Sequence, residues 1–268
     1  MAGRDSTDAR RAMITTSWDD GHLTDLRLAD LLETYGIPAT FYIPHTDRLL
    51  DQPVLQPAQL RQLADRGFEI GAHTMNHTVL TAVSDEKARS EIANSRRYIA
   101  DATGRDCVMF CPPQGRFTPR HVEMFRDAGY SAFRTVEMWS IDHARSANTQ
   151  LTEIPTTLQA QPQPVMSIAR NLIKRRAWAN GKLYLKHGRS SAGDWTRSAA
   201  ALLEHVLAVG GVFHLWGHSW ELEAFDQWAR LESVLALLRD AADRATLTTN
   251  RQAAGIALPD NAAPTTTT

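Results

Sequence analysis

A regular alternation of short β-prone runs and longer amphipathic segments constrains the fold of this chain more than any other feature. Apolar residues at helical spacing, followed closely by a glycine, recur over 24–35, 57–66, 84–102 and 118–128. β-prone runs lie between them, at 14–18, 39–43, 68–72, 106–110 and 131–134. Strands that alternate with helices of about ten to fifteen residues indicate parallel β-α units. The sequence therefore predicts an α/β fold built on a parallel sheet.

The alternation breaks between residues 139 and 195 and then resumes. No linker composition bounds this middle part, so we interpret it as an insertion within one domain that spans 13–255. We expect residues 1–12 to be a flexible N-terminus and the low-complexity end, 256–268, to be disordered. The elements expected from the insertion onward are strands at 151–154, 182–187, 211–216 and 245–248, and helices at 165–179, 195–209 and 226–240.

Composition excludes several classes of function. The 29 basic and 30 acidic residues leave no electrostatic footprint for nucleic acid or an anionic membrane. No apolar run approaches the ~18 residues that a membrane span needs, and the polar start has no signal-peptide core. The two cysteines, Cys107 and Cys111, do not have the spacing of a zinc site. We expect a reduced, cytoplasmic protein; its oligomeric state does not follow from the sequence.

The first strand ends in two adjacent carboxylates, Asp19 and Asp20, followed by Gly21. Two neighbouring negative charges at a strand end require a bound cation, a proton on one acid, or full solvation. Parallel β-α folds bind ligands at the carboxyl ends of their strands. Asp19, His73, Pro113 and His218 all fall just past such ends. The sequence alone leaves the three alternatives open.

Histidines supply two further candidate positions. His73 and His77 are four residues apart in a loop after a strand, where both rings can reach one cation, or can be unrelated loop residues. Alternation in the late strand puts His214, Trp216 and His218 on one face. His214 lies in mid-strand and is expected to be a hydrogen-bonded interior residue, whereas His218 is better placed to reach a substrate.

Taken together, Ser-Trp-Asp-Asp-Gly, His-Thr-x-x-His and a late strand ending in histidine resemble the polysaccharide deacetylase family, also called the NodB-homology family or carbohydrate esterase family 4. The resemblance extends over roughly residues 13–250. It implies a distorted (β/α) barrel with six or seven parallel strands. It also implies removal of acetyl groups from N-acetylated sugars with a divalent metal, usually zinc.

By motif position, the resemblance implies a role for each matching residue. Asp20, His73 and His77 would be the metal ligands, and Asp19 the general base. The backbone amide of Gln114, just after two prolines, would help to hold the oxyanion, and His218 would be the general acid.

The chain departs from the family pattern in its third motif. Cys111 stands where an arginine usually orients the catalytic aspartate, and Gln114 stands where an aromatic residue is usual. We hypothesise that Arg134, at the end of the strand 131–134, replaces the missing arginine as the partner of Asp19; a surface role is the alternative, and Arg116 is the weaker candidate. The family's fourth motif has no clear equivalent, Trp139 with Asp142 being only a loose match.

Three tryptophans and a glutamate are candidates for a sugar subsite, with core packing as the alternative for the rings. They are Trp139, Trp216, Trp220 and Glu221.

The function that fits these features is metal-dependent removal of an N-acetyl group from a sugar or glycoconjugate. Without a signal peptide, a cytoplasmic sugar intermediate fits better than secreted peptidoglycan or chitin. One alternative is hydrolysis of a non-sugar amide on the same fold. The other is a non-catalytic carbohydrate-binding protein.

Overall fold

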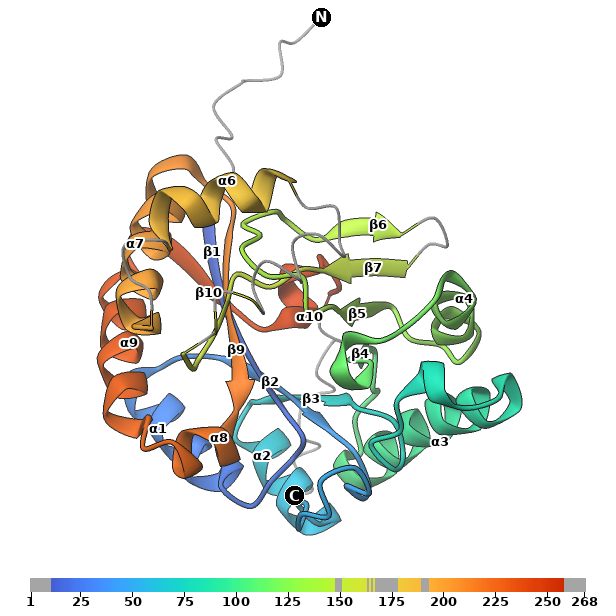
Figure 1. Ribbon diagram of the computed structural model, residues 1–268. Coiled ribbons are helices and arrows are strands. Elements are labelled where there is room, and N and C mark those ends of the chain that lie inside the picture. Colours follow the sequence, from blue (N-terminus) through green and yellow to red (C-terminus); the bar gives the residue numbers. More distant parts are fainter. Residues whose placement is uncertain are drawn as a thin grey trace, which may run out of the picture.

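The computed structural model of the protein describes residues 11–147, 151–162, 164, 166, 178–188 and 193–257 (Figure 1). Its helices and strands are, in chain order, β1 (Ala12–Asp19), α1 (Asp25–Tyr35), β2 (Ala39–Ile43), α2 (Pro57–Asp65), β3 (Glu69–Ala72), η1 (Leu80–Ala82), α3 (Asp85–Thr103), β4 (Met109–Phe110), η2 (Pro113–Gly115), α4 (Pro119–Asp127), β5 (Ala132–Arg134), β6 (Arg145–Ala147), β7 (Leu151–Ile154), β8 (Leu158–Gln159), α6 (Trp178–His187), α7 (Trp195–Val209), β9 (Val212–His218), α8 (Ser219–Ala224), α9 (Trp228–Asp240), β10 (Ala245–Thr248) and α10 (Asn250–Ala253).

One curled sheet forms the centre of the fold, and most helices lie around its outside (Figure 1). The strand order is β6-β7-β5-β4-β3-β2-β1-β9-β8, and β10 pairs with β1. Every pairing in the described residues is parallel except that of β6 with β7. The predicted distorted β/α barrel is confirmed. Its ten strands exceed the expected six or seven because the 139–195 segment adds β6 and β7 to one edge and β8 to the other.

The helix boundaries follow local capping signals, as the sequence predicted. Ser84 caps α3 by accepting a hydrogen bond from the N–H of Lys87, and Thr118 caps α4, which begins with a proline. Gly36 and Gly104 end α1 and α3 in the left-handed conformation. Short-range chemistry thus sets the lengths of the elements that lead into the site.

Two expectations for the insertion have different outcomes. The strand at 151–154 is confirmed as β7. The strand expected at 182–187 is wrong, because those residues belong to helix α6. Apolar and polar residues alternate there for too few positions to separate the two periods, and the helix instead packs against α7. The basic helix expected at 165–179 lies almost wholly outside the described residues, and the domain division stays a prediction.

The two faces of the sheet differ in polarity. Leucines and phenylalanines of the helices cover the outer face, where Trp18 is fully buried. The inner face carries buried polar groups, among them Ser17, whose hydroxyl is hydrogen-bonded to Nε2 of His214 at 2.8 Å. The expected interior position of His214 is confirmed, and its burial lowers the pKa of the ring to about 3. Charged side chains are therefore held inside the barrel, next to the strand ends.

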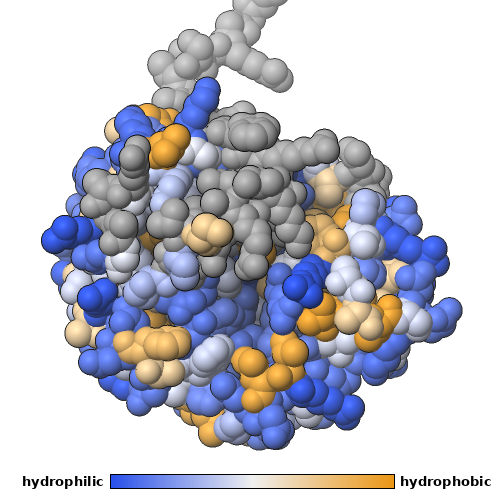
Figure 2. Space-filling model, viewed as in Figure 1, coloured by the Kyte–Doolittle hydropathy of each residue, from blue (hydrophilic) through white to orange (hydrophobic). Residues whose placement is uncertain are grey.

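The surface in this view is mainly hydrophilic, and hydrophobic residues gather in a few separate patches (Figure 2). Among the described helices, none is long and apolar enough to cross a membrane.

Candidate active site

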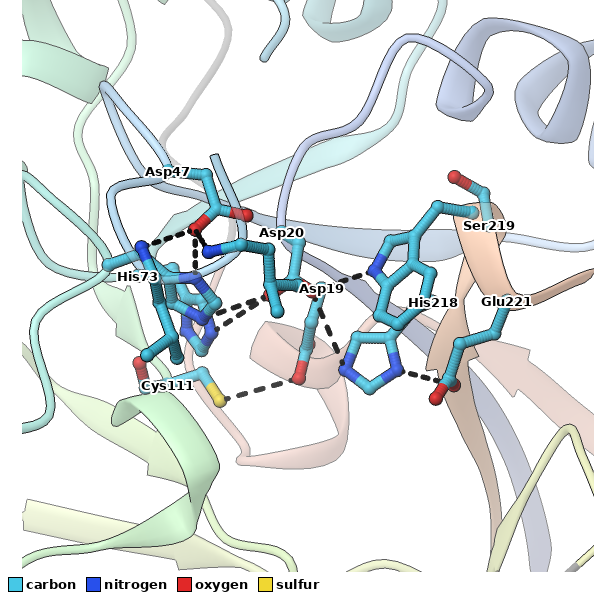
Figure 3. Close-up of polar contacts among 12 residues, drawn as sticks. Asp19, Asp20, Asp47, His73, Cys111, His218, Ser219 and Glu221 are labelled. Carbon is cyan, nitrogen blue, oxygen red and sulfur yellow. Dashed lines mark hydrogen bonds and ion pairs between the residues drawn. The ribbon is translucent and has the colours of Figure 1, made fainter. Parts of the chain in front are cut away.

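Strand register brings the predicted residues to one end of the sheet (Figure 3). Asp19, the last residue of β1, pairs with His218 of β9 on one side and with Tyr42 of β2 on the other. Residues in register on parallel strands point to the same face of a sheet. His73 follows the end of β3 directly. The candidate acid, base and ligand residues therefore meet at the carboxyl edge of the strands.

A left-handed turn separates the two adjacent carboxylates. Asp20 has φ 77° and Gly21 has φ 64°. A Cβ at Gly21 would lie 2.8 Å from the Ile43 side chain, so only glycine fits there. Thr74 (φ 62°) and His77 (φ 52°) share this sparsely populated conformation. Such strain is typical of functional sites and here points Asp19 and Asp20 to different partners.

Asp20, His73 and His77 form a buried three-ligand cluster. Their potential ligand atoms all lie within 4.8 Å of one another. Oδ1 of Asp20 is 3.5 Å from Nε2 of His73 and 3.2 Å from Nε2 of His77. The cluster matches the metal ligands that the family resemblance implied, and their role stays a prediction.

The chemistry of these donors fits a divalent cation. Nδ1 of His73 donates a hydrogen bond to the carbonyl of Cys111 at 2.7 Å, and Nδ1 of His77 donates to Asp47 at 2.7 Å. In the neutral rings, both Nε2 atoms then carry lone pairs that face Oδ1 of Asp20, which is buried without a hydrogen-bond partner. Three converging electron pairs require a positive charge between them, supplied by a metal ion or a proton.

Without a metal, protonation takes that place. Burial alone would lower the pKa of His73, but the neighbouring Cys111 and Asp20 raise it well above its ordinary value. Burial lowers the pKa of His77, with the charge of His73 acting in the same direction. One imidazolium thus balances the cluster, and a bound cation would displace its proton.

The predicted pairing of Arg134 with Asp19 is present. The Arg134 side chain is fully buried, and Nη2 contacts both carboxylate oxygens of Asp19. Its guanidinium carbon lies 4.8 Å from the ring of Trp216 and 5.4 Å from that of Tyr42. Burial alone would lower the pKa of Arg134, but the negative charge of Asp19 outweighs it. Arg134 therefore holds Asp19 from β5 rather than from the third-motif loop.

Cys111 occupies the space beside this ion pair. Its thiol is fully buried, and Sγ lies 3.9 Å from Oδ2 of Asp19. Asp19, His73 and Cys111 also satisfy the spacing of a metal cluster. Asp19 is already engaged by Arg134, so the Asp20 cluster fits a cation better.

His218 lies between two carboxylates. Nδ1 is 2.6 Å from Oε2 of Glu221, and Nε2 is 3.8 Å from Oδ2 of Asp20. Burial alone would lower the pKa of His218, but Asp20 and Glu221 raise it to about 9. The ring is therefore protonated at neutral pH in the metal-free protein, as a proton donor must be.

Two of the four predicted substrate contacts are buried instead. Trp139 is 2% exposed and packs edge-on against Tyr184, with ring centroids 5.0 Å apart. Trp216 is 7% exposed and supports Arg134. The prediction that these rings form an open sugar subsite is wrong for both, because the strand and its insertion turn them into the core.

The other two predicted contacts have partners inside the site. Glu221 accepts hydrogen bonds from Gln159 and Gln161 in addition to its contact with His218, so its carboxylate orients the ring rather than facing an open subsite. Trp220 is half-buried and donates from Nε1 to Oδ2 of Asp20 at 2.9 Å. A sugar contact by Trp220 stays a prediction.

Gln114 follows the two prolines in the short helix η2, in the left-handed conformation with φ 55°. Its side chain is exposed, which suits a role that only its backbone amide would play. That role in holding an oxyanion stays a prediction.

Sequence reasoning missed three buried acids around the site. Asp47 contacts His77, and Glu91 accepts hydrogen bonds from the backbone and side-chain N–H groups of Asn76. Asp25 is fully buried, which raises the pKa of its carboxyl well above the ordinary value. None belongs to a recognisable motif. Only the His-x-x-Glu spacing at 218–221 carried a local signal for a partner of His218.

Comparison with known proteins agrees with the site. The family model described as polysaccharide deacetylase matches residues 6–133, which confirms the resemblance seen in the motifs. A peptidoglycan-N-acetylglucosamine deacetylase of Bacillus cereus is 31% identical over 130 residues, or 48% of this chain and 56% of that protein. A peptidoglycan-N-acetylmuramic acid deacetylase of Bacillus subtilis is 26% identical over 41% of this chain and 23% of its own length. The chain thus matches at most about half of these relatives.

Solved structures share the fold over nearly the whole chain. One from Mycobacterium smegmatis has a TM-score of 0.63 at 16% identity and covers 95% of this chain and 93% of its own. Another is a mutant, with restored enzymatic activity, of a pseudoenzyme of carbohydrate esterase family 4; its TM-score is 0.55 at 15% identity, over 92% of this chain and 68% of its own.

Proposed function

Because the chain belongs to the polysaccharide deacetylase family by its match over residues 6–133, we propose that it is a metal-dependent hydrolase that removes the N-acetyl group from an amino sugar of a glycan. One observation carries the proposal: a buried ligand cluster, an arginine-held carboxylate and a carboxylate-bound histidine converge at one end of the barrel. Amide hydrolysis needs all three.

We propose zinc as the metal, held by Asp20, His73 and His77. One carboxylate and two imidazoles are ligands that zinc accepts, with coordination left open for water and substrate. A divalent cation at this position supplies Lewis-acid polarisation of the amide carbonyl and lowers the pKa of a water molecule.

Asp19 and His218 divide the proton transfers between them. Arg134 contacts both oxygens of Asp19 but leaves lone pairs free, so Asp19 accepts the proton of the attacking water. Protonated His218 donates its proton to the leaving nitrogen, because an amine does not leave as an anion. The products are acetate and a free amino sugar, and one water is consumed.

The substrate class is supported by the names of the relatives. Those from Bacillus cereus and Bacillus subtilis carry names that specify N-acetylglucosamine and N-acetylmuramic acid of peptidoglycan. We propose an N-acetylated hexosamine as the reacting unit. The cytoplasmic location expected from the sequence stays a prediction.

Acetate release tests the proposal. The zinc-loaded protein is incubated with an oligosaccharide of N-acetylglucosamine, and acetate and free amine are measured with and without a chelator. Equal amounts of acetate and amine, lost on chelation, are expected. Metal binding without any acid product would contradict the proposal and favour the carbohydrate-binding alternative. Hydrolysis of a non-sugar amide only would favour the second enzyme alternative.

A further inference from the structure

The two ligand histidines are supported by different acceptors. Nδ1 of His73 donates to the backbone carbonyl of Cys111, whereas Nδ1 of His77 donates to the side chain of Asp47, both at 2.7 Å. Asp47 lies between β2 and α2, 30 residues from His77 and outside the family motifs discussed above. Figure 3 shows its carboxylate directed at the ligand cluster.

Asp47 is rigidly held in its loop. Its side chain is 1% exposed, and Oδ1 accepts hydrogen bonds from the N–H groups of Leu49 and Leu50, each at 3.0 Å. The backbone of Asp47 also pairs with Gln52 in a β-bridge. Oδ2 is buried without a hydrogen-bond partner within the described part of the chain. A carboxylate buried at this cost is oriented by its surroundings toward His77.

This contact determines which nitrogen of His77 faces the ligand cluster. A carboxylate accepts and does not donate, so Nδ1 carries the hydrogen and Nε2 presents its lone pair 3.2 Å from Asp20. A carboxylate behind a ligand histidine fixes the ring and makes the other nitrogen a stronger donor. A backbone carbonyl, as behind His73, carries no full charge.

We propose that Asp47 is a positioning residue that orients His77 and strengthens its bond to a divalent cation. The inference rests on the proposed function, because it takes His77 as a metal ligand. Asp47 acts on the ring itself, in contrast to Glu91, which holds the same loop through Asn76. The two acids therefore provide a comparison between a ligand effect and a loop effect.

The experiment measures zinc affinity by competition with a chromophoric chelator. Asp47→Asn keeps an oxygen for the Leu49 and Leu50 N–H groups but removes the charge, and it is expected to bind zinc about 10- to 100-fold more weakly. Asp51→Asn, an exposed acid in the same loop, is the matched control and should bind like wild type. Unchanged affinity in Asp47→Asn would overturn the inference. A wild-type protein that binds no zinc would instead refute the proposed function.

Glu91→Gln separates positioning from a general loosening of the loop. It should lower the thermal stability of the metal-free protein and leave zinc affinity closer to wild type than Asp47→Asn does. Equal losses of affinity in the two variants would contradict a direct role for Asp47. If Asp47→Asn fails to fold, Asp47→Ser replaces it, because its hydroxyl is too short to reach the ring; the same weakening is expected.

Discussion

Asp19 and Asp20 are neighbours in the chain, yet they belong to two parts of the site that are built differently. The ligand side consists of Asp20, His73 and His77, which come from two loops after β1 and β3. The proton-transfer side pairs Asp19 with Arg134 of β5 and places His218 of β9 against Glu221. The first depends on short local motifs, and the second on strands that are far apart in the sequence.

This difference shows which parts of such a site can vary. A motif that binds a cation is held by spacing within one loop, so its residues stay together. The partner of Asp19 needs only to reach the inner face of the sheet, and Arg134 does so from a strand 115 residues away. The thiol at Cys111 is small enough to lie beside it.

Removing a ligand should have the largest effect. We expect His77→Ala to lose bound zinc and to reduce turnover by at least ~10³-fold, because the cation supplies several kcal/mol of transition-state stabilisation. Metal content and acetate release are measured on the same sample. His45→Ala, an exposed histidine nearby, serves as the control. Retention of stoichiometric zinc by His77→Ala would break the division between the two sides.

Removing the proton donor should leave the ligand side intact. We expect His218→Ala to keep its zinc and to lose about 10²–10⁴-fold in turnover, the contribution typical of a general acid. Steady-state kinetics and metal analysis give both values. Near-normal turnover would exclude His218 as the acid, and loss of zinc would assign it to the ligand side.

Breaking the buried ion pair should show up in stability as well. Arg134→Gln leaves Asp19 as a buried carboxylate without its cationic partner, which costs about 3–5 kcal/mol of the free energy of unfolding. Urea unfolding of the metal-free protein measures the change. The second substitution Cys111→Arg in that background should recover part of it. Wild-type stability in Arg134→Gln would show that the pair contributes nothing to the fold.

The smallest expected effect is on pH dependence. The pKa of His218 in the folded protein, about 9, exceeds its ordinary value of 6.5. Its ion pairs therefore stabilise the fold fully below about pH 6.5 and are lost as pH rises through about 9, a contribution of about 3 kcal/mol. Unfolding free energies of metal-free wild type and His218→Gln are compared across that range. Parallel curves for the two proteins would refute the shift.

The ligand side could be predicted from the sequence because its chemistry is local. Asp20 follows a strand and precedes a glycine, and His73 and His77 share one loop, so spacing alone brings their donors together. Arg134 was also within reach, since the carboxyl ends of parallel strands converge at one edge. The barrel followed from the same strand-helix alternation.

The errors arose where the contacts depend on tertiary packing. Trp139 and Trp216 are buried by segments whose position the sequence pattern does not define, and residues 182–187 form a helix that contacts α7. Asp47 gave no signal, because a single acid in a loop has no periodicity. Partners of this kind are recognised only once the loops are placed in space.

The most direct test of the two-sided site compares Asp19→Asn with Asp20→Asn. Each substitution removes one charge from adjacent positions, and zinc content and acetate release are measured for both. We predict that Asp20→Asn loses zinc and activity together, whereas Asp19→Asn keeps one zinc per chain but loses turnover. Equal zinc content in the two variants, or near-normal turnover in Asp19→Asn, would contradict the separate roles of the two carboxylates.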